Sequence, residues 1–536
     1  MSVLRASCGV FAVALAIVAY PLCAQAKVPS FDGRVTGFLG QQNGGMPADA
    51  WTGTSLGTAK RLVSALQSAP RSRALRDLQF RVMVSALKPP QADGSPLPSL
   101  FALEVERLAA MGEAEALNEV VRGAGGYADP LIAAVTVNAL MMAGEKETAC
   151  AIARSHPLQQ PFALRVEIAC KLVAGDNAGA LAAAVPLRTA DPAFARLVEI
   201  AAGGLPPNAA PPTELDGPAM AMLDLAYVQP PASILRTMQP SLIRALVSHR
   251  TLPMPVRLEI AERGEALAII DASRLGDIYA EAVRGRVNLP APMARRARLV
   301  ASARAAQSPQ QLMSSIAAVY GDEKGGALFP TMARGSALAL VNLPARPEYA
   351  DVAQEAMRGF LLLGDGARTQ AWTRLALTAA RDNARAMQAL DRLMPLVAVA
   401  GIDQPRRLPP EEVNRWYELV RQEDPAKAAL RGNLMLELLR ATGIDMPPGA
   451  TALPEAPPAN ARLVSPPAST MQALQTAASG RRRAETALLA ALSTGETPLV
   501  ELHPAAVGAI VRALRQAGED HAARLFAVEV AIAHGL

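Results

Sequence analysis

Two cysteines are the first candidates for chemistry in this sequence. Cys150 and Cys170 lie in MAGEKETACAIARSHPLQQPFALRVEIACKLVAGD, between two copies of the phrase Ala-Gly-acid. A metal site would need further ligands, and only His156 is near in sequence. A redox pair is disfavoured because the stretch has no C-x-x-C motif. The pair is therefore interpreted as structural.

The spacing of the cysteines fits a helical hairpin. Apolar periodicity predicts helices near 146–155 and 162–174, and the two cysteines are equidistant from residue 160, inside the turn. Residues equidistant from such a turn lie at similar height, since each helical residue rises about 1.5 Å. They can then reach the Cα separation of about 4.4–6.8 Å that a disulfide requires. We predict a disulfide between Cys150 and Cys170; two free buried thiols are the alternative.

A second candidate is a carboxylate cluster beside aromatic residues. Glu411, Glu412 and Glu418 accompany Trp416 and Tyr417 in PPEEVNRWYELVRQEDP, and paired carboxylates can cleave glycosidic bonds. However, two prolines followed by two acids are typical of a helix start. The five histidines form no zinc-binding motif, and phosphate-loop and G-x-S-x-G signatures are absent. No catalytic, cofactor-binding or metal-binding residue is assigned.

The N-terminus has the layout of a secretory signal peptide. Arg5 precedes the apolar run GVFAVALAIVAY, and Ala24-Gln25-Ala26 supplies small residues before Lys27. We expect residues 1–26 to be removed after Ala26, leaving a periplasmic or secreted chain; an uncleaved anchor is the alternative. Leu22 before Cys23 argues against lipidation. No later apolar run approaches 20 residues, so we expect no transmembrane segment in the mature chain.

Composition narrows the function further. Apolar residues make up 51% of the 536-residue chain but aromatic residues only 4%, so small aliphatic side chains must build the core. The 53 basic and 48 acidic residues are mixed along the chain, whereas a nucleic-acid-binding protein concentrates its basic residues. We therefore expect no nucleic-acid partner.

Apolar residues recur with helical spacing from about residue 57 onward, and strand-like alternation is nearly absent. A Gly-acid dipeptide follows one helical stretch and precedes another at six places. Glycine suits the left-handed end of a helix, and an acid suits the start of the next. We expect helix boundaries at these glycines: Gly112, Gly144, Gly175, Gly264, Gly364 and Gly518.

The spacing of 32 and 31 residues between Gly112, Gly144 and Gly175 matches a two-helix repeat. In this respect the chain resembles the tetratricopeptide repeat (TPR) family, in which Gly and an acid precede the second helix, an early Ala packs tightly and a Pro closes the unit. Gly175, Ala180 and Pro192 stand at that spacing, as do Gly144 and Ala149. The resemblance implies stacked helical hairpins. An irregular all-α domain is the alternative.

The predicted fold is all-α, an irregular TPR-like α-solenoid followed by a C-terminal helical module. Proline-rich stretches place the boundaries, and His521 and His534 are expected on a frayed surface helix. The expected segments are a signal peptide (1–26), a loosely ordered lead-in (27–55), N-terminal helical repeats (56–204), a Pro-rich connection (205–218), a second helical-repeat region (219–445), a Pro/Ala-rich linker (446–469) and the C-terminal helical module (470–536).

These features favour an exported, non-enzymatic scaffold or adaptor that binds protein or peptide partners in the cell envelope, because repeat arrays expose long concave surfaces. Two alternatives stay open. One is an all-α periplasmic enzyme acting on cell-wall or other glycans through the carboxylates near Glu411–Glu418. The other is a helical regulator of a cell-wall synthase that acts through residues 470–536.

Overall fold

The computed structural model describes residues 37–95, 98–204, 212, 215–237, 239–322, 326, 328–402, 408–446 and 449–536. Within these ranges every regular element is a helix, and β pairing is limited to isolated bridges. The prediction of an all-α fold is confirmed. No helix in the described part of the chain combines the length and the apolar character needed to cross a membrane. The predicted signal peptide lies outside the described residues, as does most of the Pro-rich connection.

The first eleven α-helices form the N-terminal part of the chain. They are α1 (Leu56–Ala65), α2 (Arg73–Val84), α3 (Leu100–Ala110), α4 (Ala114–Ala124), α5 (Pro130–Ala143), α6 (Lys146–Ser155), α7 (Phe162–Val173), α8 (Asn177–Ala183), α9 (Leu187–Ala190), α10 (Pro192–Ala201) and α11 (Gly217–Leu225).

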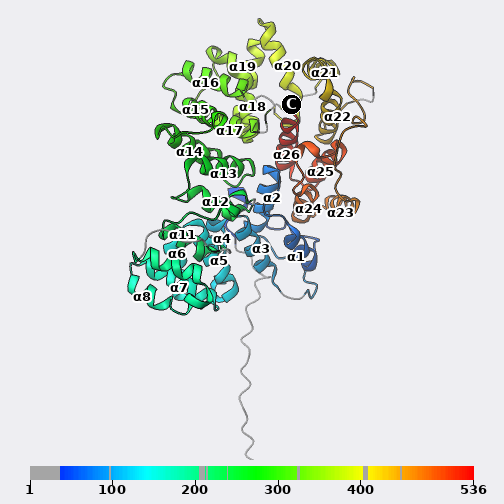
Figure 1. The fold of residues 1–536 in the computed structure, drawn as a ribbon. Helices are drawn as coiled ribbons and strands as arrows, with labels where there is room; N and C mark the ends of the chain where they lie inside the picture. Colours follow the sequence, from blue (N-terminus) through cyan, green and yellow to red (C-terminus); the bar gives the residue numbers. More distant parts are fainter. Residues whose placement is uncertain are drawn as a thin grey trace, which may run out of the picture.

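The next nine form one column in Figure 1, and each packs on its successor or near neighbour. They are α12 (Pro240–Ser248), α13 (Met254–Ala266), α14 (Ala272–Arg284), α15 (Ala291–Ala305), α16 (Pro309–Asp322), α17 (Phe329–Ala337), α18 (Ala353–Leu363), α19 (Gly366–Ala379) and α20 (Ala384–Val399).

The last helices form a second column that returns toward the N-terminal helices (Figure 1). They are α21 (Pro410–Glu423), α22 (Pro425–Ala441), α23 (Ala468–Ser479), α24 (Arg483–Thr494), α25 (Pro504–Gln516) and α26 (Asp520–Ala533).

Helix ends follow the local rules that the Gly-acid dipeptides suggested. Five of the six glycines have positive φ and lie at a helix end: Gly112, Gly144, Gly175, Gly364 and Gly518. Gly264 is the exception, because it lies inside α13, where an added Cβ would come within 2.9 Å of Ile243 Cγ2. The boundary expected there is wrong, since close packing against α12, and not chain reversal, explains this glycine.

The chain closes on itself. Helix α2 packs on both α24 and α26, and α26 also contacts α18, α20, α22 and α25 (Figure 1). Ala523, Phe526 and Ala527 have no exposed surface. The surface helix expected around His521 and His534 is therefore wrong for most of its length: α26 is a central helix, although His521 itself is exposed.

The segments assigned to a lead-in and a linker are packed where the structure describes them. Met46 and Trp51 are buried, and Thr54 Oγ1 donates to Glu485 Oε2 at 2.9 Å, which ties residues 37–55 to α24. In the linker, Asn433 Nδ2 of α22 donates to the Pro454 carbonyl at 3.1 Å. Residues 470–536 thus share one core with α1, α2 and α22.

The cysteine hairpin forms close to the expected bounds, as α6 and α7. Cys150 is buried, and its Sγ lies 1.97 Å from Sγ of Cys170, with 5.5 Å between the Cα atoms. The pair is thus at disulfide distance, and it clasps two consecutive helices that pack on each other.

Replacing both Cys150 and Cys170 by alanine should lower the free energy of unfolding by about 3 kcal/mol, because a disulfide between residues 20 positions apart closes a loop in the unfolded chain and restricts it. Urea unfolding of the exported protein, with and without reductant, measures this. Mass spectrometry without reduction should find peptides joined through both cysteines. Two free thiols in the exported protein would contradict the assignment.

Candidate functional site

The carboxylates of Glu411 and Glu418 and the aromatic residues of α21 lie on different faces of the helix, one set exposed and the other buried. Glu411 and Glu418 are exposed, and Glu418 accepts a hydrogen bond from Arg421 Nη1 at 2.8 Å. Trp416 and Tyr417, which would have to stack on a sugar, are buried in the core. The cluster therefore has the geometry of a helix start, as its two prolines suggested.

The tryptophan side chains are buried. All three tryptophans, Trp51, Trp372 and Trp416, are at most 3% exposed. The tryptophan faces are thus taken up by the core, whereas Phe38 and Tyr227 are exposed at the surface.

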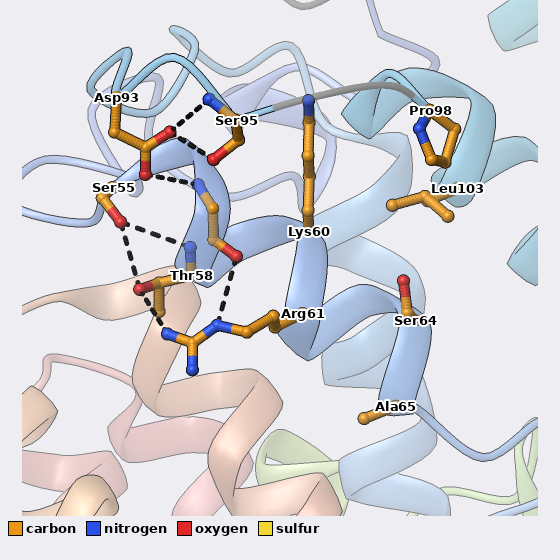
Figure 2. Close-up of a pocket in the computed structure, with 11 residues that line it drawn as sticks. Ser55, Thr58, Lys60, Arg61, Ser64, Ala65, Asp93, Ser95, Pro98 and Leu103 are labelled. Carbon is orange, nitrogen blue, oxygen red and sulfur yellow. Dashed lines mark hydrogen bonds between the residues drawn. The ribbon is translucent and has the colours of Figure 1, made fainter.

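A groove of about 760 Å³ lies at the start of α1 (Figure 2). It is bordered by the first turns of α1, by the loop that carries Asp93 and Ser95, and by Leu103 of α3. Asp93 Oδ2 accepts the backbone N–H of Gly57 at 2.8 Å, so the positive end of α1 is already capped by a carboxylate of the same chain.

The polar atoms around the first turn of α1 are bonded to one another. Ser95 donates through its hydroxyl and its N–H to Asp93, and these bonds together with that of Gly57 lower the pKa of Asp93 to about 2. Arg61 folds back to donate to Thr58 Oγ1 at 3.1 Å (Figure 2). This end of the groove is a well-capped helix start, in which Asp93, Ser95 and Arg61 are already hydrogen-bonded.

A cavity of about 510 Å³ lies where the beginning, middle and end of the chain meet. Its walls come from α2, the turn before α14, α17, the C-terminal end of α18, and α26; α2 and α26 lie side by side near the centre of Figure 1. One wall is aliphatic, with Leu338, Leu361, Leu362, Leu363 and Leu525. The remainder is charged, with Arg73, Arg76, Asp77, Glu113, Asp271, Arg334 and Glu529.

Glu265 is the buried centre of the first charged cluster. Arg334 grips it with two hydrogen bonds, Nε to Oε1 at 2.7 Å and Nη2 to Oε2 at 2.8 Å. Arg73 Nη2 lies 3.2 Å from Oε1, and Nη1 donates to the Glu265 carbonyl at 2.8 Å. Burial alone would raise the pKa of Glu265, but the two arginines lower it. The cluster joins α2 to α13 and α17.

Glu529 joins α26 to the N-terminal end of α2. Its Oε2 accepts a hydrogen bond from Ser72 Oγ at 2.6 Å, and its Oε1 accepts the Ala74 N–H at 3.0 Å. Ser72 is also the N-cap of α2, so the carboxylate completes the capping of that helix. Burial raises the pKa of Glu529, although these bonds and the nearby arginines oppose the rise.

Glu113 forms the third cluster. Its Oε1 accepts from Arg76 Nη2 at 2.7 Å and from Arg244 Nη2 at 2.9 Å. Arg76 Nη2 also donates to the Met111 carbonyl at 3.0 Å, at the C-terminal end of α3. Three carboxylates thus hold α2 against helices from every part of the chain.

Sequence analysis singled out none of these cavity residues for chemistry. Glu265 stood in the Gly264-Glu265 dipeptide, but only as a helix boundary, and Asp77 and Glu529 carried no motif. Among the residues that the structure describes, no three His, Cys, Asp or Glu side chains gather as a metal ion would require. The cavity thus combines charged side chains with an aliphatic wall.

Glu265→Gln should lower the free energy of unfolding by about 3–5 kcal/mol, because it leaves the buried Arg334 and the half-buried Arg73 without their counter-charge. The control Glu411→Gln removes an exposed carboxylate and should change it by no more than about 0.5 kcal/mol. Urea unfolding at neutral pH compares the two variants. Equal effects would mean that the Glu265 cluster is not a structural centre.

Glu529→Gln tests how the stability contributed by the contact between α26 and α2 depends on pH. The folded-state pKa of Glu529 is raised above its ordinary value of 4.5. The stability contributed by the protonated carboxyl is therefore complete below pH 4.5 and is lost as pH rises through the folded-state pKa. The wild-type protein should lose stability relative to Glu529→Gln over that rise, measured by urea unfolding at a series of pH values. A difference that is constant with pH would refute the raised pKa.

The chain matches no protein-family model, no curated protein sequence and no solved structure.

Proposed function

We propose that this protein is an exported, non-enzymatic helical adaptor that binds a protein or peptide partner in the cell envelope, with the central cavity as the binding site. The cavity carries this proposal because it combines an aliphatic wall with charged groups and has the size of known ligand sites, about 300–1,000 Å³. Its three arginines are already paired with Glu113 and Glu265, whereas the other carboxylates of its lining form no salt bridge with an arginine that the structure describes.

Export is inferred from the N-terminal sequence. The apolar run before Ala26 is typical of a cleaved signal peptide, and we place the mature protein in the periplasm or outside the cell. The cysteine pair at disulfide distance is compatible with such an oxidising compartment.

We also propose that the successive hairpins form an irregular TPR-like solenoid. Support comes from α5, α6, α7 and α8, each of which packs on the next, and from left-handed glycines at the ends of α3, α5 and α7. In a solenoid the helices would lay out one long surface, and here α26 returns to α2, so that surface would be wrapped around the cavity.

Site-specific photo-crosslinking in the envelope of the source cell tests the proposal. A benzoylphenylalanine at Leu363, in the aliphatic wall, should give an adduct of one defined mass. The same group at Met387, an exposed apolar residue of α20 outside the cavity lining, should not. No adduct from Leu363, or equal labelling from both positions, would contradict the proposal.

A further inference from the structure

The charges that line the central cavity can be accounted for one by one. Glu113 and Glu529 are bonded as described above, and Arg334 and Arg73 share Glu265. Asp271 caps α14, accepting the Arg274 N–H at 2.7 Å, so its carboxylate covers the positive end of that helix. Only Asp77 is left over.

Asp77 lines the cavity from α2, and its side chain is exposed, so a ligand can reach it. It forms no hydrogen bond or ion pair with any residue that the structure describes. The surrounding helices nevertheless partly desolvate the carboxylate and raise the pKa of Asp77. Interactions with Arg81, His521 and Arg76 oppose this rise without cancelling it. The carboxylate thus has no bonded counter-charge among the residues that the structure describes.

The surroundings of Asp77 favour a cation attached to an apolar body. Helix α18 ends at Leu363, and its C-terminal end, the negative end of the helix dipole, lines the same cavity. Leu361, Leu362 and Leu525 continue the wall with aliphatic surface. A lysine or arginine side chain offers this combination, since its long stem packs on apolar groups while its charged head reaches a carboxylate.

An anionic ligand is a poorer fit. Arg73 and Arg334 already donate to Glu265, and Arg76 donates to Glu113 and to the Met111 carbonyl. An anion would have to compete with those carboxylates for the same guanidinium groups, at the cost of leaving one of them buried and unpaired.

We propose that Asp77 is the cation-binding group of the central cavity and that the partner inserts a lysine or arginine side chain flanked by aliphatic residues. This inference rests on the proposed function and specifies the chemistry of the partner. The cation would bond to the Asp77 carboxylate, and the flanking aliphatic side chains would cover the leucines of α18 and Leu525.

Two capped pentapeptides serve as probes, Ala-Leu-Lys-Leu-Ala and Ala-Leu-Gln-Leu-Ala, titrated calorimetrically into the full mature chain. The lysine peptide should bind about tenfold more tightly or better, as expected for a hydrogen-bonded charge in a partly buried site. Asp77→Asn should bring the two affinities within about twofold, because the amide carries no charge.

Two further variants separate the contributions. Asp382→Asn removes an exposed carboxylate in the turn between α19 and α20, and it should leave the preference for lysine unchanged. Leu363→Ala trims the aliphatic wall and should weaken both peptides by the same factor. Circular dichroism melting curves of all variants check that each is folded.

Equal binding of the two peptides, or a preference for lysine that survives Asp77→Asn, would overturn the inference while leaving cavity recognition possible. The absence of any binding by the lysine peptide would overturn it as well. Butylammonium that competes with the lysine peptide at equal concentration would show that the site takes a free amine and not a polypeptide. The proposed function is tested separately by the crosslinking experiment at Leu363.

Discussion

The structure depends on the capture of α2 by carboxylates from three other parts of the chain. Glu113, Glu265 and Glu529 are brought to one helix from α4, α13 and α26, and each is largely withdrawn from water. A buried carboxylate is tolerated only when its partners are in place, so removing one partner leaves a charge that costs several kcal/mol, on the order of 3–5. Each of the three clusters is therefore complete only when the two columns of helices are assembled around α2.

Arginine side chains also bond to helix ends away from the cavity. Arg483 donates to the Ala517 carbonyl, Arg515 to that of Ala441 and Arg524 to that of Val399. Each guanidinium thus meets the unpaired carbonyls and the negative dipole at the C-terminal end of a neighbouring helix. These contacts use the planar fork of arginine, which can serve a carbonyl and a carboxylate at once. At Arg515 and Arg524 the second partner is the carboxylate of Asp520.

The sequence predicts an element correctly where its cause is local. Helix ends at Gly112 or Gly364 follow from the conformation that glycine alone adopts cheaply, and the α6–α7 hairpin follows from periodicity and cysteine spacing. It failed at Gly264, where the same dipeptide answers to packing against Ile243, and at α26, whose polar first turn hides a buried helix. The central cavity could not be predicted, because the bond between Ser72 and Glu529 spans almost the whole chain and leaves no local pattern. The departure at Gly264-Glu265 is where packing and buried charge overrode the local rule.

The position of the cavity would couple ligand binding to the assembly of the helices that form its walls. Its walls belong to α2, α18 and α26, so a ligand that touches all three can bind only when these helices are assembled. Such a ligand stabilises the closed arrangement by mass action, by about 2.7 kcal/mol at a hundredfold excess over its Kd. That gain is of the same order as one of the buried charge clusters. A partner seated on Asp77 would therefore act as a fourth clamp on α2, supplying the positive charge that the chain itself leaves out.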